Sequence, residues 1–477
     1  MDTGDNHTVL VIFGSTGNLV QKKLMPALYH LERAGMIPDD YTILCVARQK
    51  NATVETITAK LDTVVAAQGQ QLDSAVKAKL LARIQLVFMD STKKADFALL
   101  KRKLQTIDEQ HGVYNQRLFY LAIPPNIFGK VIENLAAYKL NDETNAASRI
   151  LVEKPFGTDL ASAQELIDYI ANFFAEHQVY RIDHYLAKET AQNILTFRHS
   201  NPIIEDIWGR QFIDHIQITA AETIDIEGRA NFYEGMGALR DLVQSHLLQL
   251  MALTLMEVPD KLTSEAIHNE KLSVLRAVKP IKPSHVNELV VRGQYKGYAS
   301  EAQLPDSAIE TYVALQLEVA NSRWGGVPIL LRTGKALADK RTEIQVVFKD
   351  RSRRNAELNI LTIRIQPNEG IAIMLQAKKP GFKHELQPVH MNFSYQNSFS
   401  DWQPDAYERV LVDAMQGDQT LFASGEEVIA CWNIIQPILD AWHRQEKAHP
   451  KPYAKGSWGP KKADELAGAI GFTWLNS

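Results

Sequence analysis

The sequence of 477 residues predicts an α/β domain with a doubly wound parallel sheet, followed by a β+α domain with a large, mainly antiparallel sheet. The chain is longer than one hydrophobic core usually supports, which indicates two domains. Short apolar runs alternate with helical patterns up to about residue 183, and the apolar period becomes two after about residue 205. We therefore assign residues 1–185 to the first domain and residues 186–477 to the second.

Six short apolar runs in the first half predict strands that are buried on both faces. Helical periodicity separates them, as in residues 162–174, where Leu166, Ile170 and Phe174 recur at helical spacing. This alternation is typical of parallel strands joined by helical crossovers. The predicted strands are residues 9–13, 42–47, 84–89, 118–123, 150–153 and 179–183.

Strict alternation of apolar residues in the second half predicts strands with one covered face. Helical patterns at residues 246–256 and 426–446 are the expected cover. The predicted strands are residues 315–319, 344–348, 361–365, 371–375 and 389–393.

Composition excludes several classes of protein. The chain is 45% hydrophobic and 23% charged, which is typical of a soluble globular protein. A net charge of −4 with scattered basic residues argues against a nucleic-acid partner. No run approaches the ~20 apolar residues of a membrane span, and the start, MDTGDNHTVLVIFG, lacks the basic leader of a signal peptide. Cys45 and Cys431 form no CxxC pattern, so we expect a cytoplasmic protein without a disulfide or a structural metal.

A glycine turn directly follows the first predicted strand and opens a helical stretch. Such a turn lets the backbone approach a pyrophosphate, and the helix amino terminus offers N–H groups to an anion. A plain tight turn between a strand and a helix would look similar. The candidate cofactor-binding residues are Gly14, Ser15, Thr16, Gly17, Asn18 and Leu19.

The end of the second predicted strand indicates which dinucleotide is bound. Sites that prefer NAD usually carry an acidic residue there, whereas this strand ends in Arg48, Gln49 and Lys50. A guanidinium suits a 2′-phosphate, so the sequence favours NADP, with NAD as the weaker alternative. The competing interpretation of Arg48 is a solvated loop residue.

The stretch RIDHYLAKE, residues 181–189, concentrates titratable side chains at the edge where open α/β sheets bind ligands. An apolar stripe predicts that it continues into a helix, which would place His184 and Lys188 on one face, four residues apart. Two donors converging there, with Tyr185 as a third, would suit a phosphate monoester. The alternative is a surface helix with a solvated lysine and Asp183 as its cap.

His246 stands before the apolar run LLQLMALTLM and is a candidate general base. Asp183 or Asp241 could fix its tautomer, although a histidine at the head of a buried helix is more often a satisfied core residue. Lys154 in EKPFG follows the fifth predicted strand and would lie near a bound nicotinamide. Lys335 and Lys340 in RTGKALADKR are further candidates, and each of these lysines could equally be a surface residue.

These motifs resemble, in order and over essentially the whole chain, those of the glucose-6-phosphate dehydrogenase family. The resemblance implies a Rossmann domain, then a β+α domain whose large sheet mediates association into a homodimer or homotetramer. It also implies NADP-linked oxidation of β-D-glucose 6-phosphate at C1. The matching stretches are GSTGNL, KKLMPAL, YLAIPP, EKPFGTDL, RIDHYLAKE, EGR, ALRDLVQSHLLQ, LRTGKAL and KGSWGP.

The resemblance also implies residue roles. His246 would be the base and Asp183 its carboxylate partner, while Lys154 would lie between cofactor and sugar, after a cis peptide bond to Pro155. The residues implied for the substrate phosphate are His184, Tyr185, Lys188 and Lys340. The residues implied for sugar hydroxyls are Glu222, Asp241 and Lys335.

The chain departs from the family pattern at Asn18, where Asp is usual, at Ala187, where Gly is usual, and at Ser245, where Asn is usual. The loop EGRANFYEGMGALRD also matches the family motif less closely than the other stretches do. None of these changes removes a proposed acid, base or phosphate ligand. Two rival hypotheses remain: another NADP-dependent sugar oxidoreductase with a Rossmann domain and open sheet, and a non-catalytic NADP sensor.

Overall fold

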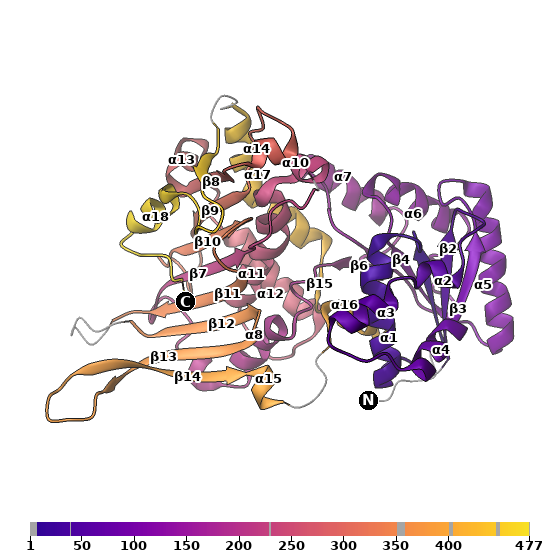
Figure 1. Ribbon diagram of the computed structural model, residues 1–477, viewed down its shortest axis with the longest axis horizontal. Helices are drawn as coiled ribbons and strands as arrows, with labels where there is room; N and C mark the ends of the chain where they lie inside the picture. The colour runs from indigo at the N-terminus through magenta and orange to yellow at the C-terminus, as the bar shows by residue number, and fades with distance from the viewer. Residues whose placement is uncertain are drawn as a thin grey trace. The chain divides into compact units, whose positions relative to one another are not determined.

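The computed structural model describes residues 7–38, 40–228, 230–350, 358–399, 404–444 and 449–476. The chain forms two compact units, each built around its own sheet (Figure 1). The first unit comprises residues 1–157, 161–187 and 404–425, and the second comprises residues 158–160, 188–403 and 426–477. The single boundary predicted after residue 185 therefore misses residues 404–425, which return to the first unit.

A seven-stranded sheet forms the centre of the first unit, in the order β15-β6-β5-β4-β1-β2-β3. All pairs are parallel except β15 with β6, which is antiparallel. The six strands predicted for this half are confirmed. The strands are β1 Thr8–Phe13, β2 Tyr41–Ala47, β3 Ile84–Phe88, β4 Gln116–Leu121, β5 Ser148–Val152, β6 Val179–Ile182 and β15 Phe422–Ala423.

Helices cover this sheet, as the predicted crossovers require (Figure 1). The returning segment supplies α16, Ala406–Gln416, which packs against α1, Met25–Ala34. Arg149 on β5 holds it by donating to the carbonyls of Ala414 and Met415 at 3.0 and 3.1 Å. The other helices are η1 Val20–Leu24, α2 Val54–Ile57, α3 Leu61–Ala67, α4 Ser74–Ala82, η2 Lys94–Asp96, α5 Phe97–His111, η3 Pro125–Ile127, α6 Phe128–Ala137, α7 Leu160–Ala171 and η4 Glu176–Gln178.

A nine-stranded, mainly antiparallel sheet forms the second unit, in the order β14-β13-β12-β11-β7-β10-β9-β8-β16. Two pairs are parallel, β10 with β7 and β16 with β8. The five strands predicted from alternation are confirmed. The strands are β7 Ile213–Ala221, β8 Val290–Tyr295, β9 Tyr312–Leu317, β10 Ile329–Gly334, β11 Arg341–Phe348, β12 Ile360–Gln366, β13 Gly370–Lys378, β14 Leu386–Ser394 and β16 Lys451–Tyr453.

Sequence reasoning missed β7 and β10, which are both central strands. All of β10 is buried and it opens with three apolar residues, so apolar and polar side chains do not alternate along it. Residues 216–220 of β7 do alternate, so that strand carried a signal that was overlooked. Both strands matter for the site, since their carboxyl ends lie side by side, with Ala221 opposite Gly334.

Helices η5 and α8 pack on strands β7, β10 and β12, while α18 packs on β8 and β9. The helical cover predicted at 246–256 is the end of η5 with α11, and the cover predicted at 426–446 is α17, with residues 445–446 outside the described part. The helices are α8 Glu189–His199, α9 Pro202–Glu205, α10 Ala230–Ala238, η5 Leu239–Leu247, α11 Leu248–Leu255, α12 Ser264–Ala277, η6 Pro283–His285, α13 Val286–Leu289, α14 Tyr298–Ala302, α15 Tyr395–Ser398, α17 Gly425–Arg444 and α18 Lys461–Gly468.

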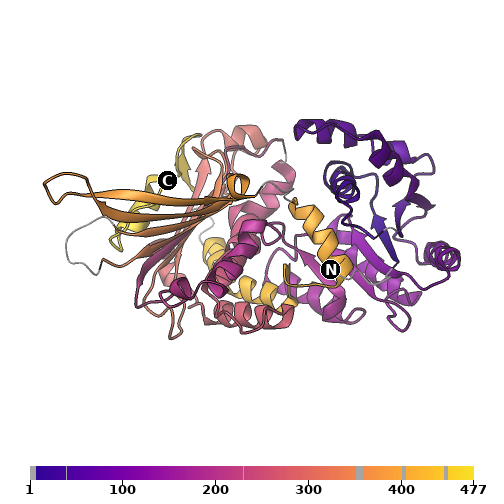
Figure 2. The same cartoon turned by 90° about the horizontal axis from the view of Figure 1, so that it is seen from below.

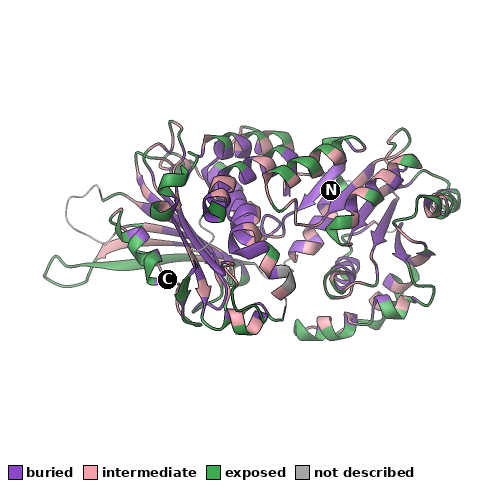
Figure 3. Cartoon of the chain, turned by 90° about the horizontal axis from the view of Figure 1, so that it is seen from above, coloured by how far each residue is buried: buried purple, intermediate pink, exposed green. Residues whose placement is uncertain are grey.

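Strand β14 ends the large sheet and forms a long hairpin with β13 (Figure 2). The far part of this hairpin is exposed (Figure 3). Two apolar side chains of β14 are also exposed, Val389 at 40% and Met391 at 62%. A groove of about 440 Å³ lies between α8 and this edge, lined by Phe197, Ile373 and Phe393 among others. An apolar edge strand that lies open to solvent is a surface suited to pairing with another chain.

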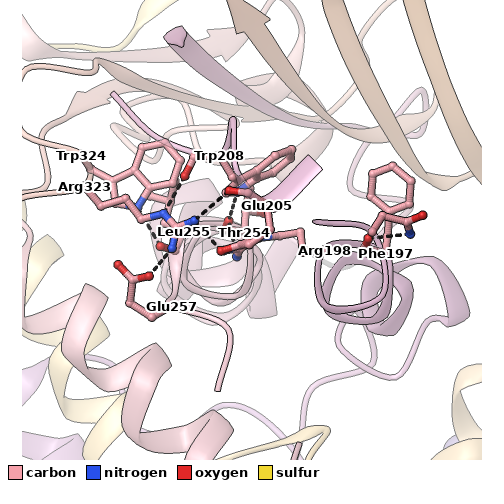
Figure 4. Close-up of polar contacts among 10 residues, drawn as sticks. Phe197, Arg198, Glu205, Trp208, Thr254, Leu255, Glu257, Arg323 and Trp324 are labelled. Atoms are coloured by element: carbon pink, nitrogen blue, oxygen red, sulfur yellow. Dashed lines mark hydrogen bonds and ion pairs between the residues drawn. The ribbon is translucent and has the colours of Figure 1, made fainter. Parts of the chain in front are cut away.

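A buried polar network joins the carboxyl ends of α8 and α11 (Figure 4). Arg198 is fully buried and binds both carboxylate oxygens of Glu205, at 2.9 and 3.0 Å, and the Thr254 carbonyl at 3.1 Å. The indoles of Trp208 and Trp324 donate to the carbonyls of Thr254 and of the next residue at 2.8 and 2.7 Å. These bonds satisfy the last carbonyls of α11, which would otherwise lack partners. They fix the two helices that lead to the candidate site of this unit.

Candidate active site

The glycine turn has the geometry that a pyrophosphate site requires. Gly14 has φ +77°, and a Cβ there would overlap the carbonyl of Ala122 at the end of β4, so only glycine fits. The Ser15 hydroxyl donates to the Val46 carbonyl at 2.8 Å and ties the turn to the end of β2. The helix begins at Asn18, and its first N–H groups have no partners within the helix.

Not all six predicted residues of the turn face outward. Ser15 is fully buried, and its hydroxyl donates to the Val46 carbonyl, so it stabilises the turn from the interior of the unit. Thr16 and Asn18 are exposed, and Gly17 and Leu19 are half-buried. A dinucleotide would therefore meet the backbone of the turn and the side chains of Thr16 and Asn18.

Arg48 follows β2 immediately and is exposed, as predicted. Asp90 follows β3, and hydrogen bonds from Thr92 lower the pKa of its carboxyl, with a smaller contribution from the charge of Arg48. The guanidinium therefore lies near the edge of the sheet at which the glycine turn stands.

The EKPFG motif follows β5 at the same edge, and its Lys154–Pro155 peptide bond is cis, as the resemblance implied. Glu153 accepts a hydrogen bond from the Tyr120 hydroxyl at 2.6 Å. Burial raises the pKa of Glu153, while hydrogen bonds from Tyr120 and Tyr407 and the charge of Lys154 oppose the rise. Sequence reasoning missed Glu153, although it adjoins Lys154. It also missed Tyr407, which arrives on the returning segment, so no local pattern could have found it.

The stretch RIDHYLAKE runs into a helix, as predicted, but the helix starts later than the apolar stripe suggested. Residues 184–187 form a turn, Lys188 is extended at φ −74° and ψ 138°, and α8 begins only at Glu189. His184 and Lys188 therefore do not share a helical face, and that prediction is wrong. Within this turn the Asp183 carboxylate accepts the Tyr185 N–H at 2.8 Å.

Two charged residues of this stretch form ion pairs with nearby glutamates. Arg181 is buried and forms a bidentate ion pair with Glu176, in which its two terminal nitrogens lie 2.6 and 3.1 Å from the two carboxylate oxygens. Lys188 lies 4.0 Å from Glu369, whose other oxygen accepts from Thr190 at 3.2 Å. Burial raises the pKa of Glu369, and the charge of Lys188 opposes the rise. Sequence reasoning missed Glu369, which follows β12 and is distant in sequence.

Helix η5 carries Asp241 and His246 and is a π-helix. Its hydrogen bonds join residues five apart, so two residues at this spacing come to the same side, which would not happen in an α-helix. His246 is buried, and the Ser245 hydroxyl donates to the Asp241 carbonyl at 2.6 Å. Asp241 and His246 are five residues apart, a spacing that predicts no shared face in an α-helix, but in this π-helix they lie on the same face.

The start of η5 is fixed by a residue that sequence reasoning missed. Glu310 accepts the backbone N–H of Leu239, the first residue of η5, at 3.0 Å. Gly237 has φ +67°, and a Cβ there would overlap the Glu310 carboxylate. Burial raises the pKa of the Glu310 carboxyl, against the backbone hydrogen bonds and the charges of nearby arginines. A carboxylate at a helix amino terminus stabilises that end.

Glu222 and Lys335 form an ion pair, at the adjacent carboxyl ends of β7 and β10. The Glu222 N–H donates to the Gly334 carbonyl at 3.0 Å, and the Lys335 ammonium also lies over the ring of Tyr233, 5.8 Å from its centre. Lys340 is exposed in the turn before β11, and no ion pair of its ammonium is recorded among the described residues. The structure therefore brings together Glu222 and Lys335, two of the three residues predicted to bind sugar hydroxyls.

The remaining predicted residues are divided between the units. The first unit holds Asp183, His184 and Tyr185. The second unit holds Lys188, Glu222, Asp241, His246, Lys335 and Lys340. The pairing of Asp183 with His246 stays a prediction.

Two family models match consecutive parts of the chain. Residues 11–193 match the glucose-6-phosphate dehydrogenase NAD binding domain, and residues 195–475 match the glucose-6-phosphate dehydrogenase C-terminal domain. The chain belongs to the glucose-6-phosphate dehydrogenase family. Its first unit is therefore a dinucleotide-binding domain, and the protein is an oxidoreductase.

Relatives support this membership over the full length. The glucose-6-phosphate 1-dehydrogenases of Chlamydia pneumoniae and Bacillus subtilis are 40% and 37% identical, with 98% of this chain and 95% and 98% of those proteins covered. A solved glucose-6-phosphate dehydrogenase in complex with glucose 6-phosphate is 33% identical, with 99% of both chains covered and a TM-score of 0.91. The structure from Mycobacterium avium is 35% identical, covers 98% of this chain and 99% of its own, and gives a TM-score of 0.84. In the described part of the chain, none of the helices has both the length and the apolar character of a membrane span.

Proposed function

We propose that this protein oxidises β-D-glucose 6-phosphate at C1 to 6-phospho-D-glucono-1,5-lactone and passes the hydride to NADP. This is the first step of the oxidative pentose phosphate pathway. The observation that carries the proposal is the arrangement in the second unit: the π-helix with Asp241 and His246 packs on β7 and β10, whose ends hold the Glu222–Lys335 pair. A base, carboxylates and an ammonium at one place suit a polyhydroxy substrate in a family of dehydrogenases.

In this proposal His246 takes the proton of the C1 hydroxyl, and Asp183 orients its ring and favours its protonated form. Bound NADP supplies the hydride acceptor. His184, Tyr185, Lys188 and Lys340 hold the phosphate, while Glu222, Asp241 and Lys335 hold the hydroxyls. Binding energy from the non-reacting phosphate then serves to position C1.

The proposed cofactor is NADP, held at the glycine turn by Gly14, Thr16, Gly17, Asn18 and Leu19, with Ser15 behind them. Arg48 at the end of β2 supports NADP over NAD, because a guanidinium suits a 2′-phosphate. Lys154 is proposed to face both cofactor and sugar. Initial rates with each cofactor test this preference, and a kcat/KM at least as high with NAD would contradict it.

Replacement of His246 by Asn tests the base. We expect kcat to fall on the order of 10² to 10⁴-fold, because the proton would lose its acceptor, while KM for glucose 6-phosphate changes little. Steady-state kinetics with a thermal unfolding control distinguish this from misfolding. A stable His246→Asn protein with near-normal turnover would refute the assignment.

Two measurements separate the proposal from its rivals. A sugar oxidoreductase of another kind would oxidise glucose about as well as glucose 6-phosphate, whereas the proposed phosphate site requires the phosphorylated sugar. A non-catalytic NADP sensor would bind NADP without forming NADPH when glucose 6-phosphate is added.

The proposed assembly is a homodimer or homotetramer formed through the large sheet, in the cytoplasm, without nucleic-acid or membrane partners. The exposed apolar side chains of β14 support association at this edge.

A further inference from the structure

Lys60 lies at the glycine turn although it is far from it in sequence. Its ammonium donates to the side-chain oxygen of Asn18 at 2.7 Å. Asn18 is the first residue of the helix that follows the turn, and it is exposed. Lys60 is the residue before α3, and its side chain makes no capping bond to that helix. The contact therefore serves the turn and not the local helix.

Two further contacts keep the segment that carries Lys60 in place. Residues 48–60 follow β2, and in dinucleotide-binding folds the end of this strand lies at the adenosine ribose of the cofactor. Gln21 on η1 donates to the Thr56 carbonyl at 2.8 Å, and α3 packs against η1. Lys60 is thus held near the amino terminus of the helix by more than its own side chain.

In the part of the chain that the structure describes, no carboxylate pairs with the Lys60 ammonium. Among the described residues, the recorded contact of the Lys60 ammonium is a neutral amide, whereas Lys77 and Lys130 pair with the carboxylates of Asp62 and Glu133. The first turn of η1 contains no acidic residue. A helix amino terminus already carries partial positive charge, so an added ammonium is unfavourable there unless an anion binds.

We propose that Lys60 is a further cofactor-binding residue, whose ammonium contacts the phosphate oxygens of the bound dinucleotide. Asn18 holds the ammonium in place through a neutral amide oxygen, so the charge of Lys60 is not neutralised by this contact. The inference rests on the proposed binding of a dinucleotide at the glycine turn, and it adds Lys60 to the residues that bind the dinucleotide. A charge-assisted hydrogen bond to phosphate is among the stronger polar contacts.

Equilibrium binding tests the proposal without relying on turnover. Isothermal titration of the full-length protein with NADP should show that Lys60→Ala raises Kd about tenfold, while Lys60→Arg, which keeps the charge, raises it less than about threefold. Lys103→Ala, which removes a half-exposed cation from α5 in the same unit, is the matched control and should leave Kd unchanged. Thermal unfolding of each variant checks that the fold is intact.

The outcomes distinguish the parts of the argument. Titration of Lys60→Ala with NAD shows which phosphate Lys60 contacts. An equal rise in Kd for NAD and NADP indicates the pyrophosphate, and a rise for NADP alone indicates the 2′-phosphate. Either result supports the role of Lys60. A Lys60→Ala protein that binds both cofactors like the wild type overturns the inference and leaves the proposed function standing. Wild-type protein that binds neither cofactor overturns both.

Discussion

At the scale of single residues, the structure separates charged side chains that serve the fold from those available for chemistry. Arg181 and Arg198 are buried and bind Glu176 and Glu205 with two bonds each, so their charges are used inside the units. The sequence gives no sign of this, because a charged residue beside a motif looks the same in either role. Burial and partner geometry decide between them.

Glu408 leads to a prediction about pH at this scale. Burial raises the pKa of its carboxyl to about 8, and the charge of Asp405 adds to this, while the bond from the Asp405 N–H opposes it. The pKa in the unfolded chain is ~4.3. Because the folded-state pKa is the higher one, the protonated carboxyl stabilises the fold below ~4.3, and this contribution is lost as pH rises to about 8.

Glu408→Gln should therefore become more stable than the wild type as pH rises. Glutamine mimics the protonated acid and keeps an oxygen for the Asp405 N–H. We expect the difference in unfolding free energy to grow from near zero at acidic pH to on the order of 1–2 kcal/mol near pH 8, after allowance for solvent screening. Urea unfolding at several pH values measures it, with exposed Glu109→Gln as the control. A difference that does not vary with pH would contradict the argument.

At the scale of elements, the helices at both candidate sites contain π-helical segments. Helix η1 follows the glycine turn, and η5 carries Asp241 and His246. Extra residues in a helical turn are uncommon and often mark functional positions, because they change which side chains share a face. The start of η5 further depends on Gly237 and Glu310.

Gly237→Ala should damage this start. Alanine disfavours φ +67°, and its Cβ would overlap the Glu310 carboxylate, so we expect a loss of about 1–3 kcal/mol of stability and a lower kcat. Gly235→Ala is the matched control, since its Cβ would meet no atom within 4 Å, and it should be neutral or slightly stabilising. Thermal unfolding and steady-state kinetics report both effects. Equal behaviour of the two variants would show that Gly237 has no special role.

At the scale of the whole molecule, the chain passes between its two units after residues 157, 160, 187, 403 and 425. The proposed base His246 belongs to the second unit, and its proposed carboxylate partner Asp183 belongs to the first. The second unit also presents an apolar edge strand, and the proposed dimer would cover it.

Met391→Lys tests that assembly. A lysine on an exposed edge strand opposes pairing with another chain, so we expect the dimer dissociation constant to rise at least about tenfold. Ile203→Lys, at a side chain that is 77% exposed on α9, is the control and should leave association unchanged. Sedimentation velocity over a range of protein concentrations measures both. An unaltered dimer fraction in Met391→Lys would place the interface elsewhere.

The sequence alone determined the fold class, the confirmed strands and the family, because hydrophobic periodicity and short motifs are local signals. Hydrophobic periodicity also gave wrong or missing predictions for particular elements. Strand β10 does not alternate, since it is buried on both faces, and a turn at residues 184–187 delays until Glu189 the helix that the apolar stripe predicted.

Only the tertiary structure decided which distant residues meet. It brought Tyr407 to Glu153, Glu310 to the start of η5, Glu369 to Lys188 and Lys60 to Asn18. It also turned the spacing between Asp241 and His246 into a shared helical face. These contacts join residues that are far apart in the sequence, and they form only when the whole chain packs. A window of neighbouring residues therefore holds no information about them.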